Sequence, residues 1–246
     1  MTLETWEWGL MVVAALSMGL AKSGFSGVSL IAVFIFTEIF GAREQVGVAL
    51  PMLIVADFIV FPAFVKHGNW REVWILLPPT VIGGGVAFYI LQSVDNAVMR
   101  PIVGIVILLM VFMQLARKWK PDAVYTFAMT KGFGIFAGLA GGMATVLANA
   151  AGPVQQLYLL SKRMDKMDLI GVGARFFLIV NLLKVPLLSD LELVTSETLK
   201  MNLYMLPALV VGVFSGKKIL HLVPQKVFEN FIVIFAFVAS VKLIFF

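Results

Sequence analysis

The sequence predicts an all-α polytopic membrane protein. Three observations lead to this fold class: 61% of the 246 residues are hydrophobic, only 13% are charged, and the apolar residues gather into ten stretches. Soluble domains are nearer half apolar and a quarter charged. The chain has no cysteine, which excludes disulfides, thiolate catalysis and iron–sulfur ligation. We expect one membrane domain over residues 1–246, with no cofactor.

The lengths of the apolar stretches predict six full spans and two shorter helical hairpins. A full span needs about 20 residues, and six stretches come close: 46–65, 73–92, 99–116, 168–188, 201–219 and 226–246. The other four are shorter and form two adjacent pairs, 8–21 with 28–40 and 127–143 with 146–160. We expect each pair to be a broken or re-entrant hairpin, and two thin full spans are the alternative.

The breaks between the paired stretches are rich in glycine. The first, Gly19–Ser29, reads GLAKSGFSGVS, and the second, Gly132–Pro153, reads GFGIFAGLAGGMATVLANAAGP. A helical glycine costs roughly 1 kcal/mol and a proline about 3. Non-helical backbone at membrane depth must be buried in protein or line a wet cavity. We therefore expect the two breaks to be the halves of one binding site, with close helix packing as the alternative role of the glycines.

The two halves of the chain resemble each other, which predicts an internal repeat. GVALPMLIVADFIVFP from Gly47 resembles GVGARFFLIVNLLKVP from Gly171, and this pairing aligns Asp57 with Asn181. Each half, 1–120 and 121–246, holds five segments. Because five is odd, the repeats must be inverted, as in many secondary transporters. The first hairpin should enter from outside and the second from the cytoplasm.

Basic residues in alternate loops predict the topology. The basic loops are those with Lys66 and Arg71, with Arg117, Lys118 and Lys120, with Lys162, Arg163 and Lys166, and with Lys217, Lys218 and Lys226. The positive-inside rule places these loops in the cytoplasm and both termini on the outer side. The net charge of +5 comes mainly from these loops, so it gives no indication of nucleic-acid binding.

The two breaks resemble those of a known family. AKSGFSGVS and GLAGGMATVLANAAGP are similar to the broken hairpins of the sulfite exporter TauE/SafE family, also called the TSUP family, and the resemblance covers nearly the whole chain. It implies transport of small sulfur-containing anions in the bacterial inner membrane: sulfite, thiosulfate, or sulfonates such as sulfoacetate. Export follows only from the family's name.

The polar residues of the breaks also favour an anion as the ligand. Lys22 is costly inside a membrane unless it meets an anion or water; the alternative is that it reaches the outer surface. The second helix of each hairpin should begin near Ser26–Gly27 and near Asn149–Ala150, and helix N-termini attract anions. The expected substrate-binding residues are Lys22, Ser23, Gly24, Ser26, Gly27, Thr145, Asn149, Ala150, Gly152, Gln155, Arg175 and Asn181.

Three further charges fall inside predicted spans. Arg175 lies roughly 10 Å along its helix from Asp168, where it can hold an anion bidentately or extend to the cytoplasmic surface. Asp57 is near midspan and is either the carrier of a coupling proton or a fixed partner of Lys22 or Arg175. Lys184 is expected to extend to the outer surface.

Two other functional classes have to be weighed. Gly24-Phe25-Ser26-Gly27 fits the GxSG pattern of intramembrane serine proteases, which need a general base near the serine. The two histidines, His67 and His221, fall on the predicted cytoplasmic side, whereas Ser26 belongs to the outer hairpin, so we expect no enzyme. An anion channel that uses the same breaks is the second alternative. The sequence is compatible with a homodimer.

Overall fold

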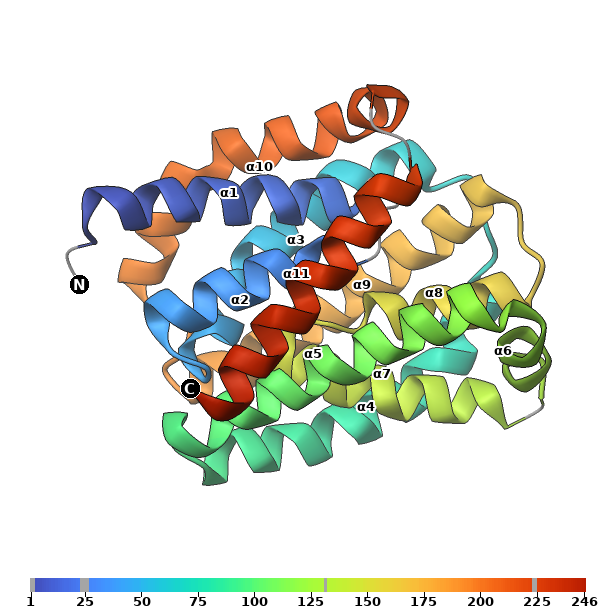
Figure 1. Cartoon of the computed structure of the whole chain (residues 1–246), viewed down its shortest axis with the longest axis horizontal. Helices are drawn as coiled ribbons and strands as arrows, with labels where there is room; N and C mark the ends of the chain where they lie inside the picture. Colours follow the sequence, from blue (N-terminus) through green and yellow to red (C-terminus); the bar gives the residue numbers. More distant parts are fainter. Residues whose placement is uncertain (1–2, 23–26, 131, 223–224) are drawn as a thin grey trace.

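The computed structural model describes residues 3–22, 27–130, 132–222 and 225–246 (Figure 1). Within these ranges the chain forms eleven helices and no strands. They are α1 (Thr5–Lys22), α2 (Ser29–Phe40), α3 (Glu44–Phe64), α4 (Trp70–Ser93), α5 (Asn96–Trp119), α6 (Pro121–Ala128), α7 (Phe133–Ala148), α8 (Gly152–Ser161), α9 (Lys166–Asp190), α10 (Ser196–Leu222) and α11 (Gln225–Phe245).

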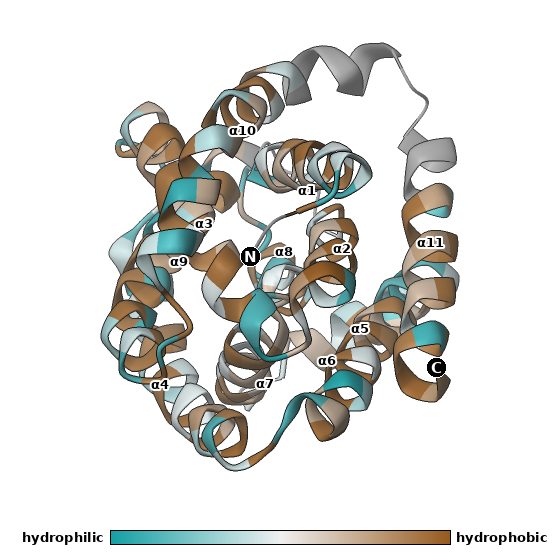
Figure 2. Cartoon of the chain, turned by 90° about the vertical axis from the view of Figure 1, so that its left-hand side faces the viewer, coloured by the Kyte–Doolittle hydropathy of each residue, from teal (hydrophilic) through white to brown (hydrophobic). Residues whose placement is uncertain are grey.

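Five helices in the described part are long and apolar enough to cross a membrane: α3, α4, α5, α9 and α10. They coincide with five of the six expected full spans, and α11 coincides with the sixth. Large apolar side chains, among them Trp74, Leu203, Phe214 and Ile234, are exposed on the outer helices, where hydrophobic residues prevail (Figure 2). An apolar exterior of this extent suits lipid rather than water, and the prediction of an all-α polytopic membrane protein is confirmed.

Both expected hairpins are present, and their second helices are short. α2 has 12 residues and α8 has 10. At 1.5 Å per residue they measure about 18 and 15 Å, which is less than the roughly 30 Å of a bilayer's hydrocarbon core. Neither helix can therefore cross a membrane alone, which favours the re-entrant alternative over two thin spans.

The second break lies close to its expected position. The second helix of this hairpin was expected to begin near Asn149–Ala150; α7 ends at Ala148 and α8 begins at Gly152. Asn149 ends α7 in the left-handed region at φ 51°, and Pro153 lies at the start of α8. A left-handed residue ends a helix, and proline suits the first turn of the next. A separate helix, α6, also precedes α7 where we expected one continuous stretch from residue 127.

Two glycines of α7, Gly138 and Gly142, are in helical backbone that packs against α4. A Cβ atom at Gly142 would lie 2.2 Å from the carbonyl oxygen of Thr80, and one at Gly138 would lie 2.4 Å from Pro79. The first hairpin repeats this arrangement, since a Cβ atom at Gly19 would lie 2.4 Å from the carbonyl oxygen of Leu209 on α10. Close packing, the alternative role, is therefore correct for these three glycines.

The helix pairs follow a two-fold pattern. α1 packs on α10 as α7 packs on α4, whereas α3 packs on α9 and α5 on α11. Exchanging α1–α5 for α7–α11 leaves this set of pairs unchanged. The α1–α2 hairpin starts and ends at the end of the bundle that carries both termini, and the loops after α3, α5 and α8 lie at the opposite end (Figure 1). An inverted repeat would produce this arrangement, and the repeat itself stays a prediction.

Substitution of Gly142 tests the contact between α7 and α4. Gly142→Ala should lower the free energy of unfolding by about 1–3 kcal/mol, because the added methyl group overpacks a filled contact. Gly85→Ala on α4 is the matched control, since a Cβ atom there would meet nothing within 4 Å. Thermal unfolding in detergent measures both variants. Equal melting temperatures for the two would contradict the contact.

Candidate functional site

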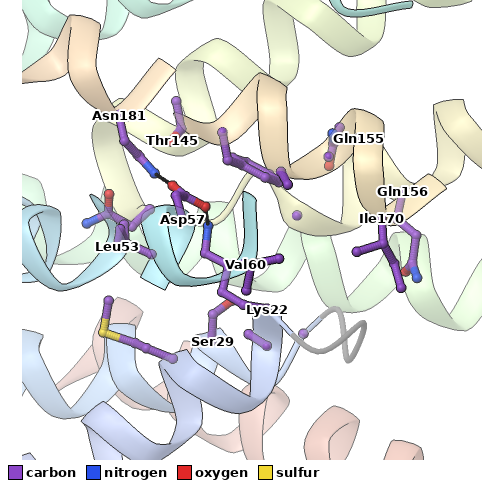
Figure 3. Close-up of a pocket in the computed structure, with 18 of the residues that line it drawn as sticks. Lys22, Ser29, Leu53, Asp57, Val60, Thr145, Gln155, Gln156, Ile170 and Asn181 are labelled. Carbon is purple, nitrogen blue, oxygen red and sulfur yellow. Dashed lines mark hydrogen bonds and ion pairs between the residues drawn. The ribbon is translucent and has the colours of Figure 1, made fainter. Parts of the chain in front are cut away.

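A cavity of about 120 Å³ lies between the two hairpins (Figure 3). It is lined by the end of α1, the start of α2, the middle of α3, the end of α7, the start of α8 and the first two thirds of α9. Eight of the expected site residues line it together: Lys22, Gly27, Asp57, Thr145, Asn149, Gly152, Gln155 and Asn181. The structure thus brings both glycine-rich breaks to one cavity.

A chain of three polar residues crosses the cavity. The Lys22 ammonium forms an ion pair with the Asp57 carboxylate, whose other oxygen accepts a hydrogen bond from Asn181 Nδ2 at 2.7 Å (Figure 3). The Lys22 ammonium also lies 4.8 Å from the centre of the Phe177 ring. Asp57 is 1% exposed. Lys22 therefore turns inward instead of reaching the outer surface, and Asp57 is its partner rather than that of Arg175.

The second helix of each hairpin begins at the cavity wall. α2 begins at Ser29 and α8 at Gly152, and both residues line the cavity. Within the described residues, the residue before each helix makes no side-chain capping bond. At α2 the N–H groups of Leu30 and Ile31 already donate to backbone carbonyls, and at α8 Pro153 has no N–H, which leaves the N–H groups of Gly152 and Val154. Unpaired N–H groups carry the positive end of the helix dipole, which favours a bound anion.

Amide side chains add hydrogen-bond donors to the same wall. Gln155 Nε2 is buried and has no hydrogen-bond partner within the described part of the chain. Gln156, a second lining residue, accepts a bond from the Arg117 guanidinium at 3.2 Å through its side-chain oxygen, which leaves its NH₂ group available. Buried donors without partners are costly, so these amides suit a ligand that offers oxygen acceptors.

Arg175 does not line the cavity, unlike the prediction. Its guanidinium donates to the backbone carbonyls of Val65, His67 and Gly68, and it stacks 5.3 Å from the Trp70 ring. Val65 is the C-cap of α3, and His67 and Gly68 follow it in the α3–α4 loop, so Arg175 satisfies carbonyls that have no helical partner where the chain leaves α3. The residue is 4% exposed, so it does not extend to the cytoplasmic surface either.

Lys184 does not line the cavity but contacts two residues that do, and the sequence analysis misplaced it. It is 2% exposed rather than extended to the surface. Its ammonium donates to Asn149 Oδ1 at 2.6 Å and to the Thr145 carbonyl oxygen at 3.0 Å, both at the tip of the α7–α8 hairpin. Its spacing was a usable signal, because positions 177, 181 and 184 share one helix face.

The other expected residues are placed as follows. Ala150 is buried but does not line the cavity, because its N–H donates to the carbonyl oxygen of Ala144 and closes the end of α7. Thr145 and Asn149 line the cavity and also contact Lys184. Ser23, Gly24 and Ser26 lie outside the described residues.

Comparison with known proteins gives one match. A family model described as sulfite exporter TauE/SafE matches residues 10–243, which include both hairpins and the whole cavity. No curated protein and no solved structure matches the chain.

A double-mutant cycle tests the ion pair in the cavity. Asp57→Leu alone should lower the free energy of unfolding by about 3–5 kcal/mol, because it leaves a mostly buried ammonium without a partner. The double variant Lys22→Met with Asp57→Leu should lose clearly less than the sum of the two single variants. Thermal unfolding in detergent gives all four values. Strictly additive losses would mean that the pair contributes no coupling.

Proposed function

Because this chain belongs to the sulfite exporter TauE/SafE family, we propose that it carries small sulfur-containing oxyanions across the bacterial inner membrane through the cavity between its hairpins. The family is one of membrane transporters and not of enzymes, so the chain is a transporter, and the serine-protease alternative does not apply. The proposed substrates are sulfite, thiosulfate and sulfonates such as sulfoacetate.

One observation carries the proposal for the site: the Lys22 ammonium and the uncapped start of α8 line the same small cavity. Sulfite and sulfonate groups present several oxygens around one sulfur atom, so they need donors from more than one side. Lys22, the first N–H groups of α8 and the amide of Gln155 offer such donors. At about 120 Å³ the cavity is smaller than the roughly 300–1,000 Å³ of pockets for drug-sized ligands, which favours a small ion.

The ion pair provides the first step of the proposed mechanism. In the structure the Lys22 ammonium is held by Asp57, and an entering anion competes with the carboxylate for that ammonium. Leaving Asp57 buried, charged and without its partner would be costly. Protonation of Asp57 relieves this cost, which makes the proton the coupling ion in our proposal.

Alternating access is the second step of the proposed mechanism. We propose that the parts that carry the two hairpins move relative to each other around the bound anion. Both termini lie at one end of the bundle (Figure 1), and the basic loops predict that this end faces outward. A negative-inside membrane drives an uncoupled anion outward by about 2.3 kcal/mol per charge per 100 mV, whereas a monovalent anion that moves together with one proton carries no net charge and does not feel this force.

Thermal stabilisation by a panel of anions tests the substrate class. A ligand at 100 times its dissociation constant adds roughly 2.7 kcal/mol to the folded state. We expect sulfite, thiosulfate or sulfoacetate to raise the melting temperature of the purified protein, and phosphate and acetate to have little effect. Equal stabilisation by all five would contradict the proposed specificity, and the absence of any response would favour a channel.

A matched pair of variants locates the response in the cavity. Lys22→Gln should abolish stabilisation by the sulfur anions, because the cavity then lacks its lining cation. Arg175→Gln removes a buried cation outside the cavity, so it should lower the melting temperature yet keep the response. If Lys22→Gln binds the anions normally, the charge assignment is wrong.

Replacement of Asp57 tests the coupling ion. In liposomes, Asp57→Asn should lose the flux driven by a proton gradient, because an amide cannot carry the proton. Exchange of anion for anion should continue, since that reaction moves no net proton. Both fluxes can be followed with a radiolabelled substrate. A pH dependence of flux that matches the unaltered protein would remove Asp57 from this role.

A further inference from the structure

The cavity occupies only one half of the bundle. On α9 its lining residues run from Leu169 to Asn181, although the helix continues to Asp190. On α3 the lining residues run from Leu53 to Val60, although the helix begins at Glu44. In Figure 3 the cavity extends from Asn181 at one end to Gln156 and Ile170 at the other.

The exposure of the lining residues indicates where the cavity opens. Asp57, Thr145 and Asn181 at its inner end are buried, whereas Gln156 and Ile170 are partly exposed. The exposed end lies toward the loops that follow α3 and α8. The opposite end, toward the loop between α9 and α10, is closed.

The tip of the α7–α8 hairpin closes that end. Of its residues 147–151, all but Asn149 are buried, and Asn149 is partly exposed. Gln45 Nε2 donates to the Leu147 carbonyl oxygen at 3.2 Å, and Asn149 Nδ2 donates to the Val46 carbonyl oxygen at 3.3 Å. Both bonds join the tip to the first turn of α3, beyond the last lining residue of that helix.

Lys184 joins the same tip to α9. Its ammonium contacts Asn149 Oδ1 and the Thr145 carbonyl oxygen, and Asn149 in turn reaches α3 through its NH₂ group. Lys184 lies three residues after Asn181, which is one helical turn, about 4.5 Å, from the residue that holds Asp57. One face of α9 therefore contacts both the closed end of the cavity, through Lys184, and the charged pair, through Asn181.

We propose that the tip of the α7–α8 hairpin is the gate on the α9–α10 side of the cavity, and that Lys184 is the positioning residue that latches it. This inference rests on the proposed function in treating the cavity as the transport site. Access from the α9–α10 side then requires the Lys184 ammonium to leave Asn149 and Thr145. Removal of these hydrogen bonds frees the tip from Lys184 and leaves its two hydrogen bonds with α3 in place.

Cysteine accessibility tests the gate directly, because the chain has no cysteine of its own. Leu53→Cys places a thiol in the cavity wall. Ser93→Cys and Lys66→Cys, in separate proteins, mark the two ends of the bundle, since Ser93 precedes the α4–α5 loop and Lys66 lies in the α3–α4 loop, and both are exposed. The proteins are placed in sealed vesicles, and a membrane-impermeant maleimide is applied from each side.

We expect Leu53→Cys to react only from the side on which Lys66→Cys reacts. With Lys184→Met added, it should react at least tenfold faster from the side of Ser93→Cys. Lys200→Met is the matched control: this exposed lysine lies in the first turns of α10, near the same end, and its loss should leave the pattern unchanged.

A second variant keeps the test decisive if Lys184→Met does not fold. Asn149→Gly removes the side chain that Lys184 holds, and glycine tolerates the φ of 51° found there. It should open the same side. Reaction of Leu53→Cys from the Ser93 side in the unaltered protein, or one-sided reaction in both variants, would overturn the gate. The labelling needs no substrate, so its outcome is separate from that of the anion panel.

Discussion

A charged pair held inside an apolar bundle is the constraint on which the site depends. Lys22 and Asp57 are tolerable at membrane depth only together, and their contact fixes the end of α1 against the middle of α3. Asn181 extends this chain to α9. Three helices from distant parts of the sequence are thereby held at one point, and the two hairpin breaks meet beside them. The cavity lies beside this pair, which needs polar neighbours and has to be shielded from lipid.

The contact between Asp57 and Asn181 also bears on the predicted internal repeat. The sequence analysis aligned these two residues as equivalent positions of a repeat, and equivalent positions touch only close to a two-fold axis. Their hydrogen bond, together with the pairing of α3 with α9 and of α5 with α11, is what an inverted repeat would produce. The axis would then pass through the cavity, where the two halves contribute a carboxylate and an amide at matching places.

Composition and segment length were enough to predict the helical membrane fold and the two hairpins, and the glycine and polar residues predicted eight of the residues that line the cavity. Local propensity located the second break near Asn149, but it did not show that Gly138 and Gly142 stay helical, because that depends on their contact with α4. The depth of a residue along its helix predicted poorly whether it belongs to the site. The helix face on which the residue lies predicted this better. Arg175 points to the end of α3, whereas Lys184 shares the face of Phe177 and Asn181 and reaches the hairpin tip. Neither direction can be read from hydropathy alone.

The tight contacts of the hairpins have a mechanical consequence. α7 belongs to the second half of the chain but packs closely through its glycines on α4 of the first half, and α1 packs in the same way through Gly19 on α10. Two helix surfaces in such close contact cannot slide or separate without losing most of the dispersion attraction between them. The units defined by these contacts therefore do not coincide with the two halves of the sequence. Each unit combines a hairpin from one half with a long helix from the other, so relative motion of the units would occur at the contacts of α3 with α9 and of α5 with α11.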